Sequence, residues 1–338
     1  MTDQFKIVCL GAGTGQAALL KGLKDFPLKL SAIVSVTDNG GHSGKLRNLF
    51  NTPQVGDGRQ CLLSLAADLA MVKRFDVLPT GFNPGNWFLT ELLLEGYSLA
   101  DAFGVLGSLL NSKGEVLPST EADANIVARF ETGEALSGEW EIIELNRSAA
   151  IAELFLAPRR EKSLVSRIFP EKIQASPRVV LAVQEADWLI IGPGSLRTGI
   201  IAALLPTGIK EAIQSSAAPI IYICNLMTQP GQTDGFTVAD HVKEVARYLG
   251  RQPGYVIINN LIPPKPVLKH YRLINSHSVL DGDLEALNIK VIKTDLLPSE
   301  EEINLAVKER VGSFKKWTHL LTHDGEKMAK VIKEIIEF

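Results

Sequence analysis

Two glycine-rich segments, each following a short apolar run, are the parts of the sequence best suited to bind a ligand. The first, IVCLGAGTG, covers residues 7–15, and the second, GPGSLRTG, covers residues 192–199. Glycine lets backbone N–H groups approach an anion closely, and a helix that starts after such a turn adds the positive end of its dipole. Together the segments predict a site for a phosphate-bearing ligand.

A third segment, DNGGHSGKLR at residues 38–47, places an acid before another glycine-rich turn. Asp38 can coordinate a hard cation, hold a ribose hydroxyl or act on a proton, so we predict it as the catalytic residue and metal ligand. Asp57, in the segment GDGR, is the nearest plausible partner, and Mg²⁺ needs only one or two protein carboxylates when phosphates supply the other ligands. Mg²⁺ is therefore the candidate cofactor, and no tightly bound organic cofactor is expected.

Other polar residues follow predicted strands or begin predicted helices, where they could contact the same ligand. The alternative is that they act as helix caps, solvated cations or turn residues. The predicted ligand-binding residues are Gly11, Gly13, Thr14, Gly15, Asn39, Gly40, Gly41, Ser43, Gly44, Lys45, Arg59, Asn86, Gly194, Ser195, Arg197, Thr198, Asn225 and Thr228.

Two further patterns have simpler interpretations. The first loop resembles a dinucleotide fingerprint, but Gln16 stands where that fingerprint requires its third glycine, which disfavours a nicotinamide-dependent oxidoreductase. Thr237 and Asp240 have the spacing of a capping box, and His323 beside Asp324 is interpreted as a local helix cap. None of the common nucleophile, zinc or P-loop motifs occurs in the sequence.

The order of apolar runs and helical segments predicts an α/β fold with a doubly wound, mostly parallel sheet in three layers. In such sheets the loops at the carboxyl ends of the strands share one crevice, so the glycine-rich segments should meet. We expect strands at residues 6–10, 30–37, 188–191, 220–224, 255–258 and 290–294, and helices at 17–25, 198–215, 237–249 and 324–336.

The remaining segments are predicted as additions to a single domain of residues 1–338. Residues 59–110 are mostly helical in pattern and should form a cap over the sheet. Residues 115–145 favour an inserted β-hairpin at the edge of the sheet, and residues 162–177 favour an exposed excursion.

Composition excludes several classes of function. The formal charge is −3, which argues against broad nucleic-acid binding. Three cysteines without CxxC spacing are expected to be reduced core residues. No apolar stretch approaches membrane-spanning length, and residues 2–4 are polar without a targeting pattern. We therefore expect a cytoplasmic protein without membrane insertion.

The sequence resembles the 2-phospho-L-lactate transferase superfamily, and most closely its gluconeogenesis-factor branch. The resemblance spans most of the chain in order. The blocks that carry it are GAGTG at 11–15, TDNGGHSGKLR at 37–47, GDGRQCL at 56–62, GNWFL at 85–89, GPGSLRTGIIAALLPTGIKEAI at 192–213 and CNLMTQPGQTDGFTVADHV at 224–242.

This resemblance implies a modified Rossmann-like fold, a homodimer and, as the partner, a nucleotide-linked small molecule bound across the glycine-rich loops. Members of one branch transfer a phospholactyl-type group from a guanosine-diphosphate-linked donor to a deazaflavin precursor with magnesium, and Asp38 matches their metal ligand. Gluconeogenesis-factor members are linked to carbon metabolism and cell shape and bind uridine-diphosphate sugars. The chain departs from the family at Asn39, where a second acid is usual, and at Thr322, where an arginine is usual.

Overall fold

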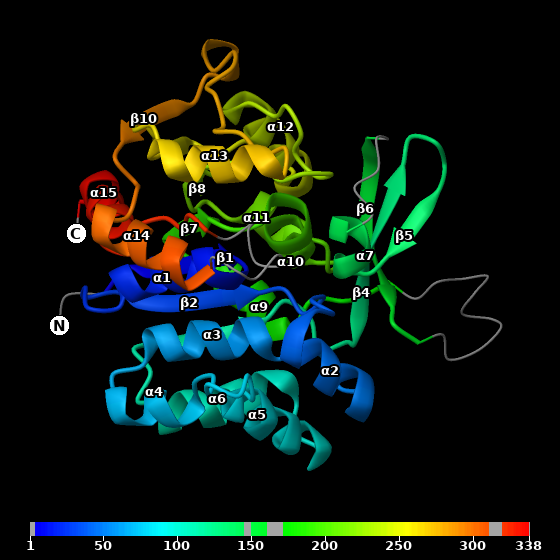
Figure 1. Cartoon of the computed structure of the whole chain (residues 1–338). Coiled ribbons are helices and arrows are strands. Elements are labelled where there is room, and N and C mark those ends of the chain that lie inside the picture. The colour runs from blue at the N-terminus through cyan, green and yellow to red at the C-terminus, as the bar shows by residue number, and fades with distance from the viewer. Residues whose placement is uncertain (1–3, 145–149, 161–171, 311–319, 338) are drawn as a thin grey trace.

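A computed structural model describes residues 4–144, 150–160, 172–310 and 320–337. Its main sheet has seven strands, all parallel, in the order β10-β9-β8-β7-β1-β2-β3 (Figure 1). The strands are β1 (Lys6–Gly11), β2 (Lys29–Val34), β3 (Gly114–Pro118), β7 (Trp188–Ile191), β8 (Ile220–Ile223), β9 (Tyr255–Asn259) and β10 (Lys290–Thr294).

Helices cover both faces of this sheet, which explains why its strands are continuous apolar runs rather than alternating ones. Ile7 and Cys9 of β1 point into one core, and Val8 and Leu10 point into the other. The first core contains residues of α1 (Gly13–Leu23), α3 (Gly56–Leu65), α5 (Pro84–Leu94), α6 (Leu99–Leu109), α13 (Lys265–Leu273), α14 (Glu300–Arg310) and α15 (Gly325–Ile336). The second contains residues of α9 (Pro177–Gln184), η1 (Leu196–Ile201), α10 (Ala202–Leu204), α11 (Ile209–Ser215) and α12 (Val238–Leu249). The predicted three-layer α/β fold is therefore confirmed.

The winding direction of the chain reverses between β1 and β7, which are neighbours in the sheet. From β1 the chain proceeds to β2 and β3 on one side, and from β7 it proceeds to β8, β9 and β10 on the other. Ligands bind outside the carboxyl ends of the strands at such a point. The two glycine-rich loops, which follow β1 and β7, therefore begin at the switch point.

The predicted cap consists of α3, α4 (Leu69–Phe75), α5 and α6, drawn below β2 in Figure 1. The inserted hairpin consists of β4 (Ala124–Phe130) and β5 (Ala135–Ser137). The insertion is larger than predicted, because β6 (Ile151–Pro158) pairs with β4 and makes a separate three-stranded sheet that carries α7 (Glu139–Glu144).

Two elements differ from the sequence-based expectation. Gly114–Pro118, expected as the start of the hairpin insertion, is β3 of the main sheet, paired with β2. The segment expected as a glycine loop is mostly helix, since α2 spans Gly41–Phe50. The exposed excursion expected at 162–177 lies largely outside the described residues. Among those that are described, no helix is long and apolar enough to cross a membrane.

Candidate functional site

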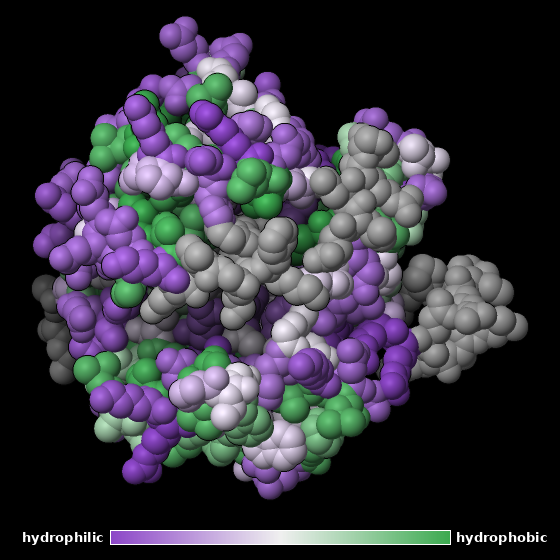
Figure 2. Space-filling view, viewed as in Figure 1, coloured by the Kyte–Doolittle hydropathy of each residue, from purple (hydrophilic) through white to green (hydrophobic). Residues whose placement is uncertain are grey.

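A cavity of about 580 Å³ lies at the carboxyl ends of β1, β2, β7 and β8. Figure 2 shows a hollow near the centre of the molecular face, above the cap helices, with hydrophilic residues in its depth. The volume falls in the range of small-molecule sites. Predicted residues that line the cavity are Gly13, Thr14, Gly15, Asp38, Gly40, Gly41, Ser43, Arg59, Asn86, Gly194, Ser195, Asn225 and Thr228.

The two glycine-rich loops pack directly against each other. A Cβ on Gly15 would lie 2.8 Å from the backbone oxygen of Pro193, and a Cβ on Gly194 would lie 3.0 Å from the backbone oxygen of Ala12. Gln16, which replaces the third fingerprint glycine, is fully buried and donates from Nε2 to the carbonyls of Cys9 (2.9 Å) and Ile33 (3.1 Å). It thus ties β1 to β2, and the loop differs in construction from a dinucleotide fingerprint.

Three half-buried carboxyls line the same cavity: Asp38 after β2, Asp57 in the first turn of α3, and Glu139 in the first turn of α7. Burial raises the pKa of Asp38, although the Gly40 N–H, 2.7 Å from Oδ1, opposes that rise. Burial, and then the charge of Asp38, raise the pKa of Asp57 to about 7. The pKa of Glu139 is raised well above its usual range by burial and then by the charges of Asp38 and Asp57.

Asp57 lies at the N-terminus of α1, where the sequence predicted a free anion cradle. Its carboxyl accepts a hydrogen bond from the Gly13 N–H. A carboxyl of this chain therefore already uses part of the first loop as an anion site. A phosphate that entered beside Asp57 would meet negative charge unless a proton or a cation came with it.

The second glycine-rich loop meets the insertion through hydroxyl groups. The hydroxyls of Ser195 and Thr198 lie 2.8 Å apart, and the Thr198 side chain also hydrogen-bonds the carboxyl of Glu139. Gln229, in the loop after β8, accepts from the Leu196 N–H at 3.2 Å and from the Ser195 hydroxyl at 3.1 Å. The insertion and the loops after β7 and β8 are therefore connected at the cavity wall.

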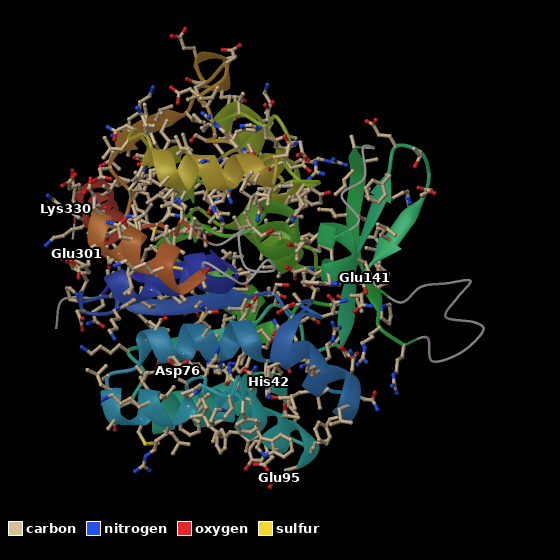
Figure 3. The ribbon with its side chains drawn as sticks, viewed as in Figure 1. His42, Asp76, Glu95, Glu141, Glu301 and Lys330 are labelled. Atoms are coloured by element: carbon tan, nitrogen blue, oxygen red, sulfur yellow. The ribbon has the colours of Figure 1, made fainter. Side chains whose placement is uncertain are left out.

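Several polar side chains that line the cavity contain buried atoms whose hydrogen bonds the described residues do not satisfy. Arg59 is 9% exposed, its Nε has no partner among the described residues, and its Nη1 makes a long 3.5 Å contact with Asp76. Buried atoms without a partner in the structure also occur in His42 (Nδ1), Asn86 (Oδ1) and Asn225 (Oδ1). Buried polar groups are normally paired, so their concentration around one cavity indicates a polar ligand. Figure 3 shows His42 and Asp76 beside α3 and the cap.

His323 is a cavity residue that the sequence interpretation assigned wrongly. Asp324, not His323, caps α15, because its side chain accepts from the N–H groups of Glu326 and Lys327. His323 Nε2 lies 3.0 Å from the Cys224 carbonyl and must donate to it, which leaves Nδ1 as an acceptor. Burial lowers the pKa of His323 to about 4, so the ring is neutral at physiological pH.

Six predicted ligand-binding residues do not line the cavity. Gly11 ends β1 in the core, and Gly44 lies inside α2 against the backbone of Asn39. Lys45 is exposed, and Thr198 is buried behind Ser195. The other two, Asn39 and Arg197, have partners elsewhere in the protein.

Arg197 belongs to a structural cluster on α12. Its guanidinium lies 3.7 Å from Glu244 and packs over the ring of Phe236. Residues Leu196–Ile201 form a π-helical turn, and this turn directs Arg197 toward α12. The sequence places Arg197 at the start of a predicted helix, where it could meet an anion, whereas in the structure its side chain faces α12 and does not line the cavity.

Asn39 holds the insertion against α2. Its Oδ1 accepts from the Trp140 N–H at 2.8 Å, and its Nδ2 donates to Glu141 Oε2 at 2.7 Å. Figure 3 shows Glu141 on α7, beside the strands of the inserted sheet. Asn39 therefore positions the two cavity residues Glu139 and Trp140 without lining the cavity itself.

Asn39→Asp is expected to lower the Tm by several degrees, because it places a second carboxylate beside Glu141 and removes the amide donor. Glu141→Gln in the Asn39→Asp background restores a donor, so the double variant should regain most of the lost Tm. The measurement is thermal unfolding of the single and double variants at pH 7.5. Equal Tm values for wild type and Asn39→Asp would contradict this role.

The sequence interpretation missed several cavity residues. Glu139 and Trp140 come from the insertion, whose contact with the glycine loops has no local signal. Tyr271, Thr322 and His323 come from the C-terminal third, and Gln60 and Asn83 from the cap. The family resemblance was the available signal for the C-terminal group, since it pointed to the position of Thr322.

The cavity carboxyls suit a cation whose remaining ligands are phosphate oxygens and water. Among the described residues, no group of three or more His, Cys, Asp and Glu side chains is arranged to hold a metal ion by itself. Mg²⁺ commonly uses one or two carboxylates and completes its shell with phosphate and water. Asp38 and Asp57 can supply those carboxylates.

Comparison with known proteins agrees with this architecture. A family model described as "2-phospho-L-lactate transferase CofD" matches residues 7–297. A Thermotoga maritima protein named "Putative gluconeogenesis factor" is 38% identical, with 98% of this chain and 99% of that protein covered. The Bacillus subtilis "Gluconeogenesis factor" is 32% identical with both chains fully covered.

A solved structure agrees as well. The crystal structure of Bacillus halodurans BH3568, titled a member of the UPF0052 family, has a TM-score of 0.83 and 28% identity, and covers 98% of this chain and 99% of that one. Both the sequence and the fold are thus shared over nearly the full length. The chain belongs to the CofD family and is similar to its gluconeogenesis factors.

Proposed function

We propose that the protein binds a nucleotide sugar of the uridine-diphosphate type in this cavity, together with Mg²⁺, and acts as a regulator linked to carbon metabolism and cell shape. One observation carries the proposal: peptide N–H groups at helix starts and three carboxyls line the same cavity. The N–H groups suit phosphate oxygens, whereas the carboxyls would repel them. Asp38 and Asp57 would hold a divalent cation, whose charge would offset the repulsion between the carboxyls and a diphosphate.

Neutral polar groups of the cavity suit the sugar and base. His323 offers an uncharged acceptor for a hydroxyl, because its Nε2 proton is used by the Cys224 carbonyl. Asn86 and Asn225 have buried amide oxygens that no described residue contacts by a hydrogen bond, and such oxygens suit N–H donors. The names of the relatives support the regulatory part of the proposal.

Calorimetric titration with UDP-N-acetylglucosamine and a panel of nucleotide sugars, with and without Mg²⁺, tests this function. We expect binding with Mg²⁺ and at least a tenfold weaker interaction in EDTA. At a ligand concentration of 100 Kd, binding should stabilise the fold by about 2.7 kcal/mol. Asp38→Asn should lose the Mg²⁺ dependence, whereas the exposed Glu95→Gln should not. No heat and no thermal shift across the whole panel would reject the proposal.

A second candidate function is a Mg²⁺-dependent transferase that moves a phospholactyl-type group from a guanosine-diphosphate-linked donor to a deazaflavin precursor. The family match and the carboxyl pair Asp38 and Asp57 favour it, since a cation there would stabilise charge on the transferred group. Incubation of donor, acceptor, Mg²⁺ and protein should give the phosphodiester product. A flat time course would count against this activity.

A further inference from the structure

A second cavity, of about 500 Å³, adjoins the first and is used by neither function above. It is formed by α1, α3, α4 and the turn after α4. The two cavities share Arg59, Gln60 and Val77. Figure 3 shows Asp76, another lining residue, at the end of α4 beside α3.

The charged residues that line the second cavity are mostly cations. Lys21 of α1, Lys24 directly after α1 and Arg59 of α3 face a single acid, Asp76. Lys24 Nζ donates to the Ala66 carbonyl at 2.8 Å. Lys21 is exposed and makes no hydrogen bond or close ion pair within the described ranges, although Glu302 on α14 interacts with it electrostatically. The lining therefore has an excess of positive charge.

Arg59 is the residue that points to a ligand. Its side chain is nine-tenths buried, its Nε has no partner in the part of the chain that the structure describes, and its 3.5 Å contact with the exposed Asp76 is at the limit of a hydrogen bond. A buried guanidinium with so little pairing is costly in the absence of an anion. Gly85 makes room for it, because a Cβ there would lie 2.8 Å from Arg59 Cδ.

Apolar side chains complete the walls. Leu63, Leu69, Val72 and Val77 line the cavity, and Leu69 is 69% exposed. We propose that this second cavity binds an anionic group of the phosphate or carboxylate type that is carried on a small apolar body. The group can belong to a separate small molecule or to the far end of the ligand in the first cavity. The lysines that define the site line only the second cavity, so the proposal does not require the nucleotide sugar.

Phenyl phosphate, with inorganic phosphate as the comparison, is the probe for this site. By calorimetry we expect phenyl phosphate to bind the wild type more tightly than inorganic phosphate does, since only the former contacts the apolar walls. Lys21→Glu should weaken phenyl phosphate binding at least tenfold. Lys73→Glu is the matched control, because Lys73 is an exposed lysine of α4 that does not line the cavity, and it should bind as the wild type does.

Nucleotide-sugar titration of the same variants distinguishes the two sources of the anion. If Lys21→Glu binds the nucleotide sugar with unchanged affinity, the anion in the second cavity belongs to a separate small molecule. If its affinity for the nucleotide sugar falls together with that for phenyl phosphate, the anion is the far end of the ligand in the first cavity. Absence of phenyl phosphate binding to the wild type, or equal binding by wild type and Lys21→Glu, overturns the proposal. Failure of nucleotide-sugar binding alone leaves the phenyl phosphate result intact and contradicts only the proposed function.

Discussion

Asp57→Asn is expected to stabilise the ligand-free protein above pH 7 and to abolish Mg²⁺-dependent ligand binding. In the folded protein the pKa of Asp57 is raised to about 7 by burial and then by Asp38, against an ordinary value of 3.8. At about 1.4 kcal/mol per pKa unit, this difference corresponds to about 4 kcal/mol. Asparagine removes the charge, and its Oδ1 can still accept from the Gly13 N–H.

The sign follows from proton linkage. Because the folded-state pKa is the higher one, the folded protein keeps a proton that the unfolded chain releases, and stability falls as the pH rises from about 4 to 7. Below pH 4 both states are protonated, so Asp57→Asn and wild type should have the same stability. Above pH 7 the variant should gain a Tm increase on the order of 5–10 °C.

Thermal unfolding from pH 4 to pH 8.5 measures this effect, and titration of the nucleotide sugar with Mg²⁺ measures the cost to binding. Glu95→Gln is the control, because it removes one negative charge from an exposed position of the cap. If the Tm of Asp57→Asn at pH 8 does not exceed that of Glu95→Gln, the ionised carboxylate of Asp57 does not destabilise the folded protein. Greater stability with weaker binding is the behaviour expected of a functional carboxyl.

The sequence predicted the framework of the site because that framework is local. Strands buried on both faces must be continuous apolar runs, and the glycine-rich segments directly follow them, so their meeting at one edge follows from the topology of a parallel sheet. The capping box of Thr237 and Asp240 was predicted correctly for the same reason. Such features are encoded within a few residues.

Other elements were missed because tertiary packing decides them. The segment that forms α2 begins with glycines, which have low helix propensity, and its N-cap Gly40 has no side chain. It is nevertheless helical, with Arg47 buried and held by Asp123 of the insertion and by the Ala124 carbonyl. The partners lie 76 and 77 residues away in sequence, beyond the range of any local pattern.

The carboxyl cluster was only partly predictable for a related reason. Asp38 and Asp57 follow recognisable turns, so both could be noted. Glu139 lies at the cavity because Asn39 holds α7 in place by hydrogen bonds to Trp140 and Glu141. The sequence suggested that Asn39 binds ligand, whereas its amide is used to position another element. The residue type of Asn39 indicated that its side chain makes polar contacts, but it did not indicate that the partners are residues of α7.

Gly15→Ala is expected to weaken ligand binding at least tenfold while the protein remains folded. The added Cβ would lie 2.8 Å from the Pro193 oxygen and 2.9 Å from its carbonyl carbon, and a backbone group cannot turn aside as a side chain can. The loops after β1 and β7 must therefore move apart. Such a shift costs about 1–3 kcal/mol of stability, and misplacing ligand-binding groups by about 1 Å reduces function strongly.

Gly104→Ala is the matched control for this substitution. Gly104 lies in α6, and a Cβ there meets no atom within 4 Å from the described residues beyond its own helix turn. Replacing a helical glycine by alanine should raise stability by about 1 kcal/mol and leave binding unchanged. Thermal unfolding and nucleotide-sugar titration of both variants therefore distinguish the general effect of replacing glycine by alanine from the specific effect of a methyl group between the two glycine-rich loops. If Gly15→Ala bound ligand with wild-type affinity, close packing of the two glycine-rich loops would not be what forms the site.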